Sequence, residues 1–514
     1  MSTESTASAA QQIAAGYAVA GPALELGSVV VNGTADPTAQ VRIPLATINR
    51  HGLVAGATGT GKTKSLQVIA EQLSAAGVPV MMADIKGDLS GLSRPGVPND
   101  KIAARAKDTG DEWTPSACPV EFLSLGTTGL GVPVRATISS FGPILLSKVL
   151  GLNATQESTL GLIFHWADQK GLPLLDLKDL RSVITYLTSE DGKPELKELG
   201  AVSPTTAGVI LRALINLAAE GADTFFGEPE LRPQDLFRLQ GGRGVITLLE
   251  LGDQAARPVM FSTFLMWVLA DLFTLLPEVG DVDKPKLVFF FDEAHLLFTD
   301  ASKAFLDQVE QTVKLIRSKG VGVYFCTQLP TDVPNNVLSQ LGARIQHAIR
   351  AFTPDDQQAL TKTVRTYPKT DVYDLSSALT SLGIGEAIVT VLSEKGAPTP
   401  VAWTDMRSPR SLMDTIGPDA IAAAAKASPL QAKYGQTADR ESAYEILSAK
   451  LAPPPPAPSA PAEAPPMPAP APRHSPGFLE QVMDSPAFKS AMRSAGTQIG
   501  REITRSIFGT GRRR

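Results

Sequence analysis

The segment from Gly56 to Thr63, read as Gly-Ala-Thr-Gly-Thr-Gly-Lys-Thr, constrains this chain more than any other part of its 514 residues. It has the G-x-x-x-x-G-K-[ST] spacing, with a strand-like apolar run before it at 52–55 and a helical pattern after it at 64–76. Glycines let the backbone N–H groups of such a loop turn toward one centre, and the following helix adds the positive end of its dipole. The segment therefore predicts a cradle for phosphate groups within a parallel α/β fold.

Each residue of this loop has an expected role. Lys62 is expected to reach the β- and γ-phosphates of a nucleoside triphosphate, and the hydroxyl of Thr63 to ligate Mg²⁺. We expect the nucleotide to be ATP, with Mg²⁺ as its cofactor. The residues expected to bind the nucleotide are Gly56, Ala57, Thr58, Gly59, Thr60, Gly61, Lys62, Thr63 and Lys64.

A second motif is an apolar strand that ends in two acidic residues, Asp292 and Glu293. A buried strand would deliver Asp292 to the sheet edge beside the phosphate loop, where it can hold the magnesium shell. Glu293 is then the candidate general base that polarises the attacking water. The alternative is that both residues cap the next helix. His295 is interpreted as a packed or solvated side chain.

Three more features fall at predicted strand ends. The strand 321–327 should lie beside the acidic strand, so Gln328 is a candidate to position water or sense phosphate, or else a strand end without a role. The segment from Asp84 to Asp88 also follows a strand, and is either functional or a solvated turn. Hydrolysis needs an arginine that neutralises developing charge. Arg344 is the candidate for this catalytic role, with Arg350 as the alternative, in the same chain or toward a neighbouring copy.

Composition sets limits on the cellular setting. The chain has 47 basic and 52 acidic residues, so its net charge of −5 does not indicate a nucleic-acid binder, although a local basic groove stays open. Two cysteines and no basic-then-apolar leader favour a reducing cytoplasm. The apolar segment 259–276 is interpreted as a core helix, and no transmembrane segment is expected.

The order of patterns along the chain predicts an interrupted core followed by a linker and a tail. The run of Pro and Ala near the C-terminus cannot form a packed core. Within the second part of the core, we expect a strand over 343–352. The expected parts are an N-terminal segment with a short helix and β pieces at 1–48, the first part of an ATPase core at 49–140, a helical insert at 141–240, the second part of the core at 241–410, a helical extension at 411–450, a Pro/Ala-rich disordered linker at 451–476 and a basic amphipathic helix at 477–514.

With these motifs in order, the chain resembles HerA-like P-loop ATPases of the HerA/FtsK superfamily, and within it the YjgR-type group. The resemblance covers about Arg50 to Val401, and Ile499–Ile503 also matches the tail of that group. It rests on the segments Arg50–Thr63, Asp84–Leu89, Phe141–Leu146, Gly151–Asn153, Phe225–Pro229, Lys284–His295, Ile316–Tyr324 and Arg350–Pro354.

The resemblance implies a RecA-like core, with a mostly parallel sheet and an extra strand between the phosphate-loop strand and the acidic strand. It implies a homo-oligomer, usually a hexameric ring, and a motor that translocates or remodels double-stranded DNA. The roughly 50 residues before Gly56 leave little room for the N-terminal β-barrel of HerA. Leu329-Pro330 also follows Gln328 where Asn-Pro is expected in this group.

Two other functions stay open beside a DNA motor. One is an ATPase that acts on a protein partner, and the other is a nucleotide-gated assembly protein without DNA activity. The linker would let the C-terminal helix find a partner at high local concentration. That helix has a net charge of +4 and is expected to dock on another subunit, a protein partner or an acidic surface.

Overall fold

The computed structural model describes residues 8–84, 87–127, 129–198, 203–250, 258–280 and 282–451. Contacts divide the chain into two units, Met1–Ala452 and Pro453–Arg514. The predicted C-terminal helix and all of the predicted linker but residue 451 lie outside the described residues.

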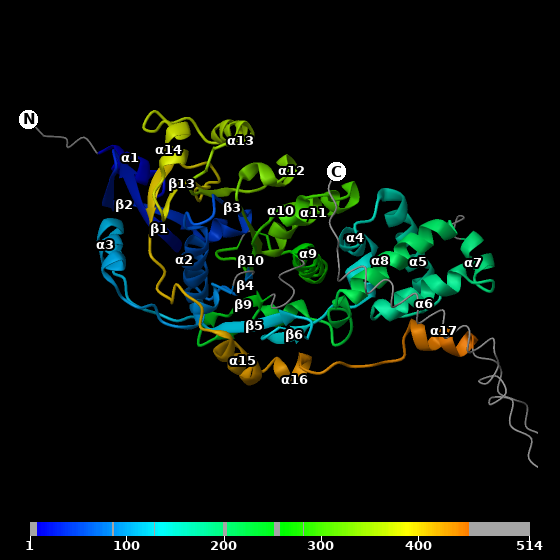
Figure 1. Cartoon of the computed structure of the whole chain (residues 1–514). Coiled ribbons are helices and arrows are strands. Elements are labelled where there is room, and N and C mark those ends of the chain that lie inside the picture. The colour runs from blue at the N-terminus through cyan, green and yellow to red at the C-terminus, as the bar shows by residue number, and fades with distance from the viewer. Residues whose placement is uncertain are drawn as a thin grey trace, which may run out of the picture. The chain divides into compact units, whose positions relative to one another are not determined.

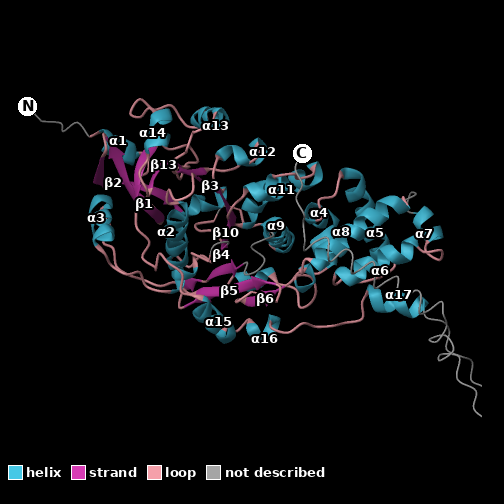
Figure 2. Cartoon of the chain, in the orientation of Figure 1, coloured by secondary structure: helices cyan, strands magenta, loops and turns pink. Residues whose placement is uncertain are grey.

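A twelve-stranded sheet forms the centre of the first unit (Figure 1, Figure 2). Its strands follow the order β2-β1-β14-β13-β12-β3-β11-β10-β4-β9-β5-β6. Their bounds are β1 Ala23–Val31, β2 Thr34–Pro44, β3 Gly52–Ala55, β4 Val80–Asp84, β5 Val120–Leu125, β6 Val132–Val134, β9 Ile246–Glu250, β10 Leu287–Phe291, β11 Val321–Thr327, β12 Ala343–Gln346, β13 Glu386–Thr390 and β14 Ala402–Met406. A separate two-stranded ribbon pairs β7 Leu239–Gln240 with β8 Arg243–Gly244.

The eight strands from β12 to β6 run parallel to one another, and β13, β14, β1 and β2 extend the sheet in antiparallel fashion. Strand β11 lies between β3 and β10, pairing with both. This confirms the expected RecA-like sheet with an extra strand between the phosphate-loop strand and the acidic strand. The N-terminal strands β1 and β2 join the edge of this sheet through β14.

Helices cover both faces of the sheet, and a helical group lies beyond the β6 edge (Figure 1). Helix α5 begins with a capping box in which Asn153 and Gln156 exchange hydrogen bonds. The helices are α1 Ala9–Ala15, α2 Lys62–Ala75, α3 Asp100–Thr109, α4 Ile138–Val149, α5 Ala154–Gln169, α6 Leu177–Thr188, α7 Lys193–Glu198, α8 Pro204–Ala219, α9 Pro258–Leu275, α10 His295–Phe298, α11 Lys303–Ile316, α12 Asn335–Leu338, α13 Pro354–Val364, α14 Leu375–Ser381, α15 Pro418–Ala427, α16 Gln431–Tyr434 and α17 Ala443–Leu451.

Strand β10 shows how the sheet separates two hydrophobic cores. Successive side chains of a strand point to opposite faces. Phe289 and Phe291 accordingly pack in the core formed with α4, α9 and α11, whereas Val288 and Phe290 pack in the core formed with α2. Because both faces are covered, the strand is apolar throughout, which is typical of a buried parallel strand.

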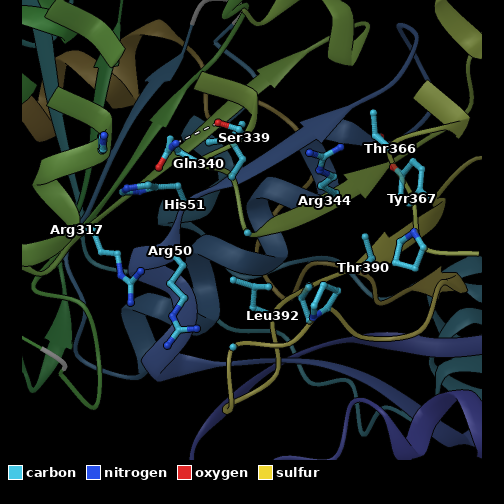
Figure 3. Close-up of a pocket in the computed structure, with 17 residues that line it drawn as sticks. Arg50, His51, Arg317, Ser339, Gln340, Arg344, Thr366, Tyr367, Thr390 and Leu392 are labelled. Atoms are coloured by element: carbon cyan, nitrogen blue, oxygen red, sulfur yellow. Dashed lines mark hydrogen bonds between the residues drawn. The ribbon is translucent and has the colours of Figure 1, made fainter. Parts of the chain in front are cut away.

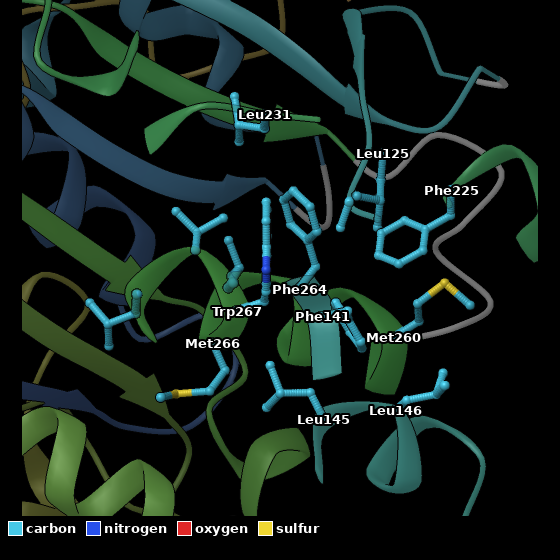
Figure 4. Packing of buried hydrophobic residues seen from close by; sticks show 14 of the residues in the cluster. Leu125, Phe141, Leu145, Leu146, Phe225, Leu231, Met260, Phe264, Met266 and Trp267 are labelled. Carbon is cyan, nitrogen blue, oxygen red and sulfur yellow. The ribbon is translucent and has the colours of Figure 1, made fainter. Parts of the chain in front are cut away.

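Helix α9 confirms the prediction of a core helix over 259–276. Phe264 is fully buried, and its ring centroid lies 5.2 Å from that of Trp267 and 5.5 Å from that of Phe225 (Figure 4). In the described part of the chain, none of the helices has the length and apolarity needed to cross a bilayer.

The predicted strand over 343–352 is wrong in its extent, because β12 ends at Gln346. The main chain leaves the sheet there and passes alongside the phosphate loop, where the carbonyl of Ala348 accepts a hydrogen bond from Ala57. The strand-like pattern in the sequence therefore extends beyond the strand itself, because contacts with the phosphate loop bend the chain after Gln346.

We expect Phe264→Ala to lower the free energy of unfolding by about 3–5 kcal/mol, because it leaves a cavity among Trp267, Phe225 and their neighbours. Phe352→Ala is the matched control, since that phenylalanine is 86% exposed and should cost less than about 0.5 kcal/mol. Chemical denaturation of both variants measures the difference. Equal effects would contradict the packing described for α9.

Candidate functional site

The loop from Gly56 to Thr63 lies at the carboxyl end of β3 and is tied to the segments on both sides of that strand. The amide of Gly56 donates to the carbonyl of Thr327 at the end of β11, over 3.2 Å. On the other side, the amide of Ala57 donates to the carbonyl of Ala348 over 2.8 Å. The loop is therefore fixed in position before any ligand arrives.

Two glycines of the loop are required by close approach as well as by backbone conformation. Gly56 has φ +149° and Gly61 has φ +116°. A Cβ on Gly56 would lie 2.5 Å from the Cβ of His347, and a Cβ on Gly61 would lie 3.1 Å from the backbone of Gly385. Gly61 is also the N-cap of α2 and makes no side-chain cap bond, which leaves the first amides of α2 to face a ligand.

His347, which the sequence analysis did not single out, braces this loop from behind. Its Nδ1 lies 2.8 Å from the carbonyl of Glu386 and its Nε2 lies 3.0 Å from the hydroxyl of Ser65 in α2. A carbonyl only accepts, so Nδ1 carries the proton and Nε2 accepts from Ser65. Burial lowers the pKa of His347 to about 4, so the imidazole is neutral at pH 7.

Lys62 from the start of α2 and the adjacent Asp292 and Glu293 from the end of β10 all lie near the thiol of Cys326. Burial raises the pKa of this thiol well above its usual value; Asp292 and Glu293 raise it further, whereas Lys62 lowers it. Cys326 is fully buried in β11, between the loop strand and the acidic strand. The Nζ of Lys62 also contacts the carbonyls of Gly56 and Ala57 within the loop.

Glu293 has an unusual backbone conformation, with φ +47°. This region is uncommon for residues other than glycine and occurs often at functional sites. The amide of Glu293 donates to Oδ1 of Asp292 over 2.9 Å, and Nδ1 of His295 lies 3.4 Å from Oε2 of Glu293. Helix α10 has Ala294 as its N-cap, so neither acidic residue caps that helix.

A buried acidic pair at the same sheet edge adds a residue that sequence analysis missed. Asp84 at the end of β4 and Glu250 at the end of β9 are direct partners in the strand register. Burial, with the nearby Asp88, raises the pKa of Asp84 to about 7, and burial, with the nearby Asp84, raises that of Glu250 to about 7. An acidic residue closing the apolar run 246–250 was the available signal.

The side chains of Gln328 and Lys64 contribute less directly to this site. Gln328 is exposed after the end of β11, and its neighbours Thr327 and Leu329 both donate to Asp332. Lys64 donates through Nζ to the carbonyl of Met413 over 2.8 Å. Any contact of Lys64 with phosphate in this arrangement would therefore come from its backbone amide.

The two candidate arginines lie at opposite ends of the sheet. The Nη2 of Arg350 donates to the carbonyl of Thr58 in the phosphate loop, over 3.2 Å. Arg344 instead lines a cavity with Arg50 and Gly342, at the amino ends of β3 and β12. The prediction that Arg344 acts catalytically on the nucleotide of its own chain is therefore wrong. Its action on a neighbouring copy stays a prediction.

The chemistry of these residues fits a nucleoside triphosphate with a divalent cation. The loop offers amides of a helix N-terminus and the ammonium of Lys62 for phosphate oxygens. Thr63 and Asp292 offer hard oxygen atoms, which Mg²⁺ prefers. Asp292 follows the strand two places from the loop strand in the sheet, at the same carboxyl edge.

Fold and site together define a P-loop ATPase with a RecA-like core. Residues 30–514 match the family model described as Helicase HerA-like C-terminal, and the chain belongs to this family. It is thus a nucleotide-driven motor of the HerA/FtsK kind. No curated protein matches the chain.

Several solved structures are similar in fold at low identity. The bacterial conjugative coupling protein TrwB, without its first 70 residues and unbound, is 14% identical, with 79% of this chain and 95% of that chain covered and a TM-score of 0.48. TrwB in complex with the non-hydrolysable ATP analogue ADPNP is 15% identical over 77% of this chain and 99% of that chain, with a TM-score of 0.48. VirB4 of Thermoanaerobacter pseudethanolicus is 14% identical over 76% and 98%, with a TM-score of 0.46.

We expect Glu250→Gln to stabilise the fold at high pH and to have little effect at low pH. Its folded pKa of about 7 lies above the ordinary 4.5, so the stability from this carboxyl is present below pH 4.5 and is lost as pH rises through 7. A neutral amide avoids that loss, which is on the order of 2 kcal/mol at pH 9.

Urea unfolding at pH 5 and pH 9 measures this difference. Glu278→Gln is the control, because that side chain is exposed after α9 and should not alter the pH dependence. A Glu250→Gln variant that lost stability at pH 9 would contradict the account of a buried carboxyl whose ionisation is costly.

Proposed function

We propose that this chain hydrolyses ATP with Mg²⁺ at the loop from Gly56 to Thr63. The observation that carries the proposal is the gathering of Lys62, Asp292 and Glu293 around Cys326, at one edge of the sheet. A basic group for phosphate, a carboxylate for a cation and a second carboxylate for water are the parts that phosphoryl transfer to water requires.

Each residue then has one task. The loop amides and Lys62 hold the β- and γ-phosphates, and Lys62 gives up its present carbonyl contacts to do so. Thr63 and Asp292 would hold Mg²⁺, which neutralises charge on the phosphates when bound. Glu293 accepts the proton of the attacking water, with His295 beside its carboxylate. Gln328, at the neighbouring strand end, would orient that water.

A cavity of about 410 Å³ beside the loop offers space for the nucleoside. Gly61, Lys64 and Ser65 line it from the start of α2, and Ile384 and Met406 line it from the opposite side. Apolar walls close to a phosphate loop suit the base and ribose of a nucleotide. We therefore place the adenosine of ATP here, over the β12–β14 side of the sheet.

We further propose that the motor acts on double-stranded DNA as a homo-oligomeric ring, an expectation that rests on membership of the HerA-like family. A motor that tracks a phosphate backbone needs only a basic lining, so the net charge of −5 does not oppose it. An ATPase that acts on a protein partner is the second candidate. The Pro/Ala-rich composition of 453–476 supports it, because such a tether can present a terminal segment to a partner.

ATP turnover by the wild type and by Glu293→Gln tests both parts of this proposal. We expect the wild type to hydrolyse ATP and the variant to lose at least about 100-fold in kcat, because the general base is removed. Double-stranded DNA should raise wild-type turnover, and more so at low salt, because phosphate contacts release counterions. Turnover that ignores DNA would favour a protein partner, and equal kcat for both proteins would contradict the role of Glu293.

The substitution Arg350→Ala tests whether Arg350, rather than Arg344, acts on the nucleotide bound by its own chain. Because Arg350 contacts the phosphate loop in its own chain, we expect its loss to lower kcat about tenfold or more. Arg365→Ala is the control, since Arg365 is exposed just after α13. Steady-state turnover at saturating ATP gives the comparison. An unchanged kcat for Arg350→Ala would leave that arginine without a catalytic role.

A further inference from the structure

A second cavity, of about 570 Å³, has Arg50, His51 and Arg344 among its lining residues (Figure 3). It lies at the amino ends of β3 and β12, whereas the phosphate loop follows the carboxyl end of β3. Arg50 and His51 line it just before β3 begins, and Arg344 lines it from the start of β12. Lys314 from α11 and Arg317, which follows that helix, line it as well. The loop at the carboxyl end of β3 is not part of it, so this cavity is distinct from the proposed ATP site.

The lining of this cavity has charges of one sign only. Arg50, Lys314, Arg317 and Arg344 are all basic, and none of the described residues that line it is an aspartate or a glutamate. Arg50 and Arg344 bring two partly buried guanidinium groups to one volume, and like charges brought together in this way cost stability unless an anion offsets them. Burial also lowers the pKa of Arg344 from its ordinary value.

Two buried donors of this cavity lack an acceptor among the described residues. They are Nε of Arg50 and Nη1 of Arg344. The neighbouring His51 is only 2% exposed, and its ring is held by the amide of Val323, which donates to Nδ1 over 3.0 Å, and by the backbone of Val313. Buried donors are nearly always satisfied, so two guanidinium donors at one cavity call for an acceptor-rich ligand.

We propose that this cavity binds a compact anion with two or more phosphate groups. Its volume is that of a small-molecule site, and its donors lie below the surface, which suits a compact polyphosphate better than a duplex backbone. Guanidinium groups bind phosphate oxygens through paired hydrogen bonds, and Arg50 and Arg344 approach the cavity from different elements. Strands β3 and β12 run from here to the phosphate loop and to His347, so a ligand in this cavity contacts both strands that position the ATP site.

Calorimetric titration with inorganic tripolyphosphate, without Mg²⁺, tests this proposal on the full chain carrying Lys62→Ala. That substitution weakens binding at the phosphate loop and leaves the second cavity intact. We expect one tripolyphosphate to bind per chain. Adding Arg50→Gln or Arg344→Gln should weaken this binding about tenfold or more each, because each removes a charge-assisted contact. Adding Arg365→Gln is the matched control and should change nothing.

Thermal unfolding without ligand checks that the variants fold. Because Arg50→Gln and Arg344→Gln remove like-charge repulsion and an unpaired donor, their Tm should equal or exceed that of the parent. Should either fail to fold, Lys314→Gln decides, since that exposed side chain lies at the rim of the cavity and should weaken binding severalfold.

Three results would overturn the proposal. The first is no tripolyphosphate binding to Lys62→Ala when the wild type binds it, which would place all binding at the phosphate loop. The second is equal binding by the arginine variants and the control. The third is displacement of tripolyphosphate by a short DNA duplex, lost with Arg50→Gln, which would make the cavity a nucleic-acid contact. None of these results depends on ATP turnover.

Discussion

The ATP site depends on the hydrogen bonds that hold the phosphate loop against its neighbouring strands. Gly56 is tied to the end of β11 and Ala57 to the segment after β12, while neutral His347 links α2 to β13 through Ser65 and Glu386. A loop fixed on both sides can keep its amides directed at one place without a ligand to organise them. Protonation of His347 would replace its acceptor nitrogen with a donor, so the support favours the neutral ring.

The parallel sheet then brings the remaining chemistry to the same edge. Asp84, Glu250 and Asp292 follow or end neighbouring strands, although more than 40 residues separate any two of them along the chain. Because parallel strands present their carboxyl ends together, each buried strand can deliver one polar side chain to a common site. The same burial makes these carboxylates costly, and it explains why Asp84 and Glu250 hold their protons more tightly than solvated acids.

Much of this arrangement could be predicted from the sequence, because local patterns determine it. The Gly-rich spacing of 56–63, the apolar runs of β10 and β11 and the helical period of α11 indicate the sheet and its site. What could not be predicted depends on contacts between distant segments. His347 lay inside an apolar run that reads as strand, and only its neighbours Ser65 and Glu386 reveal its task.

The positions of the two candidate arginines could not be predicted for the same reason. Arg344 and Arg350 are six residues apart, yet Arg350 reaches the phosphate loop and Arg344 faces the opposite cavity, because β12 crosses the sheet between its two ends. No local pattern distinguishes them. The basic cavity was likewise invisible, since its lining combines residues near 50, 315, 340 and 390.

The central claim is that Lys62 and Asp292 form one site for magnesium-bound ATP. Equilibrium binding of ATP to the Glu293→Gln protein, measured with Mg²⁺ and with a chelator, tests it directly against the same variant carrying Lys62→Ala or Asp292→Asn. The account predicts tight binding to Glu293→Gln, weaker binding without Mg²⁺, near-complete loss with Lys62→Ala, and loss of only the Mg²⁺ dependence with Asp292→Asn. Binding that is indifferent to Mg²⁺ and to both substitutions would contradict it.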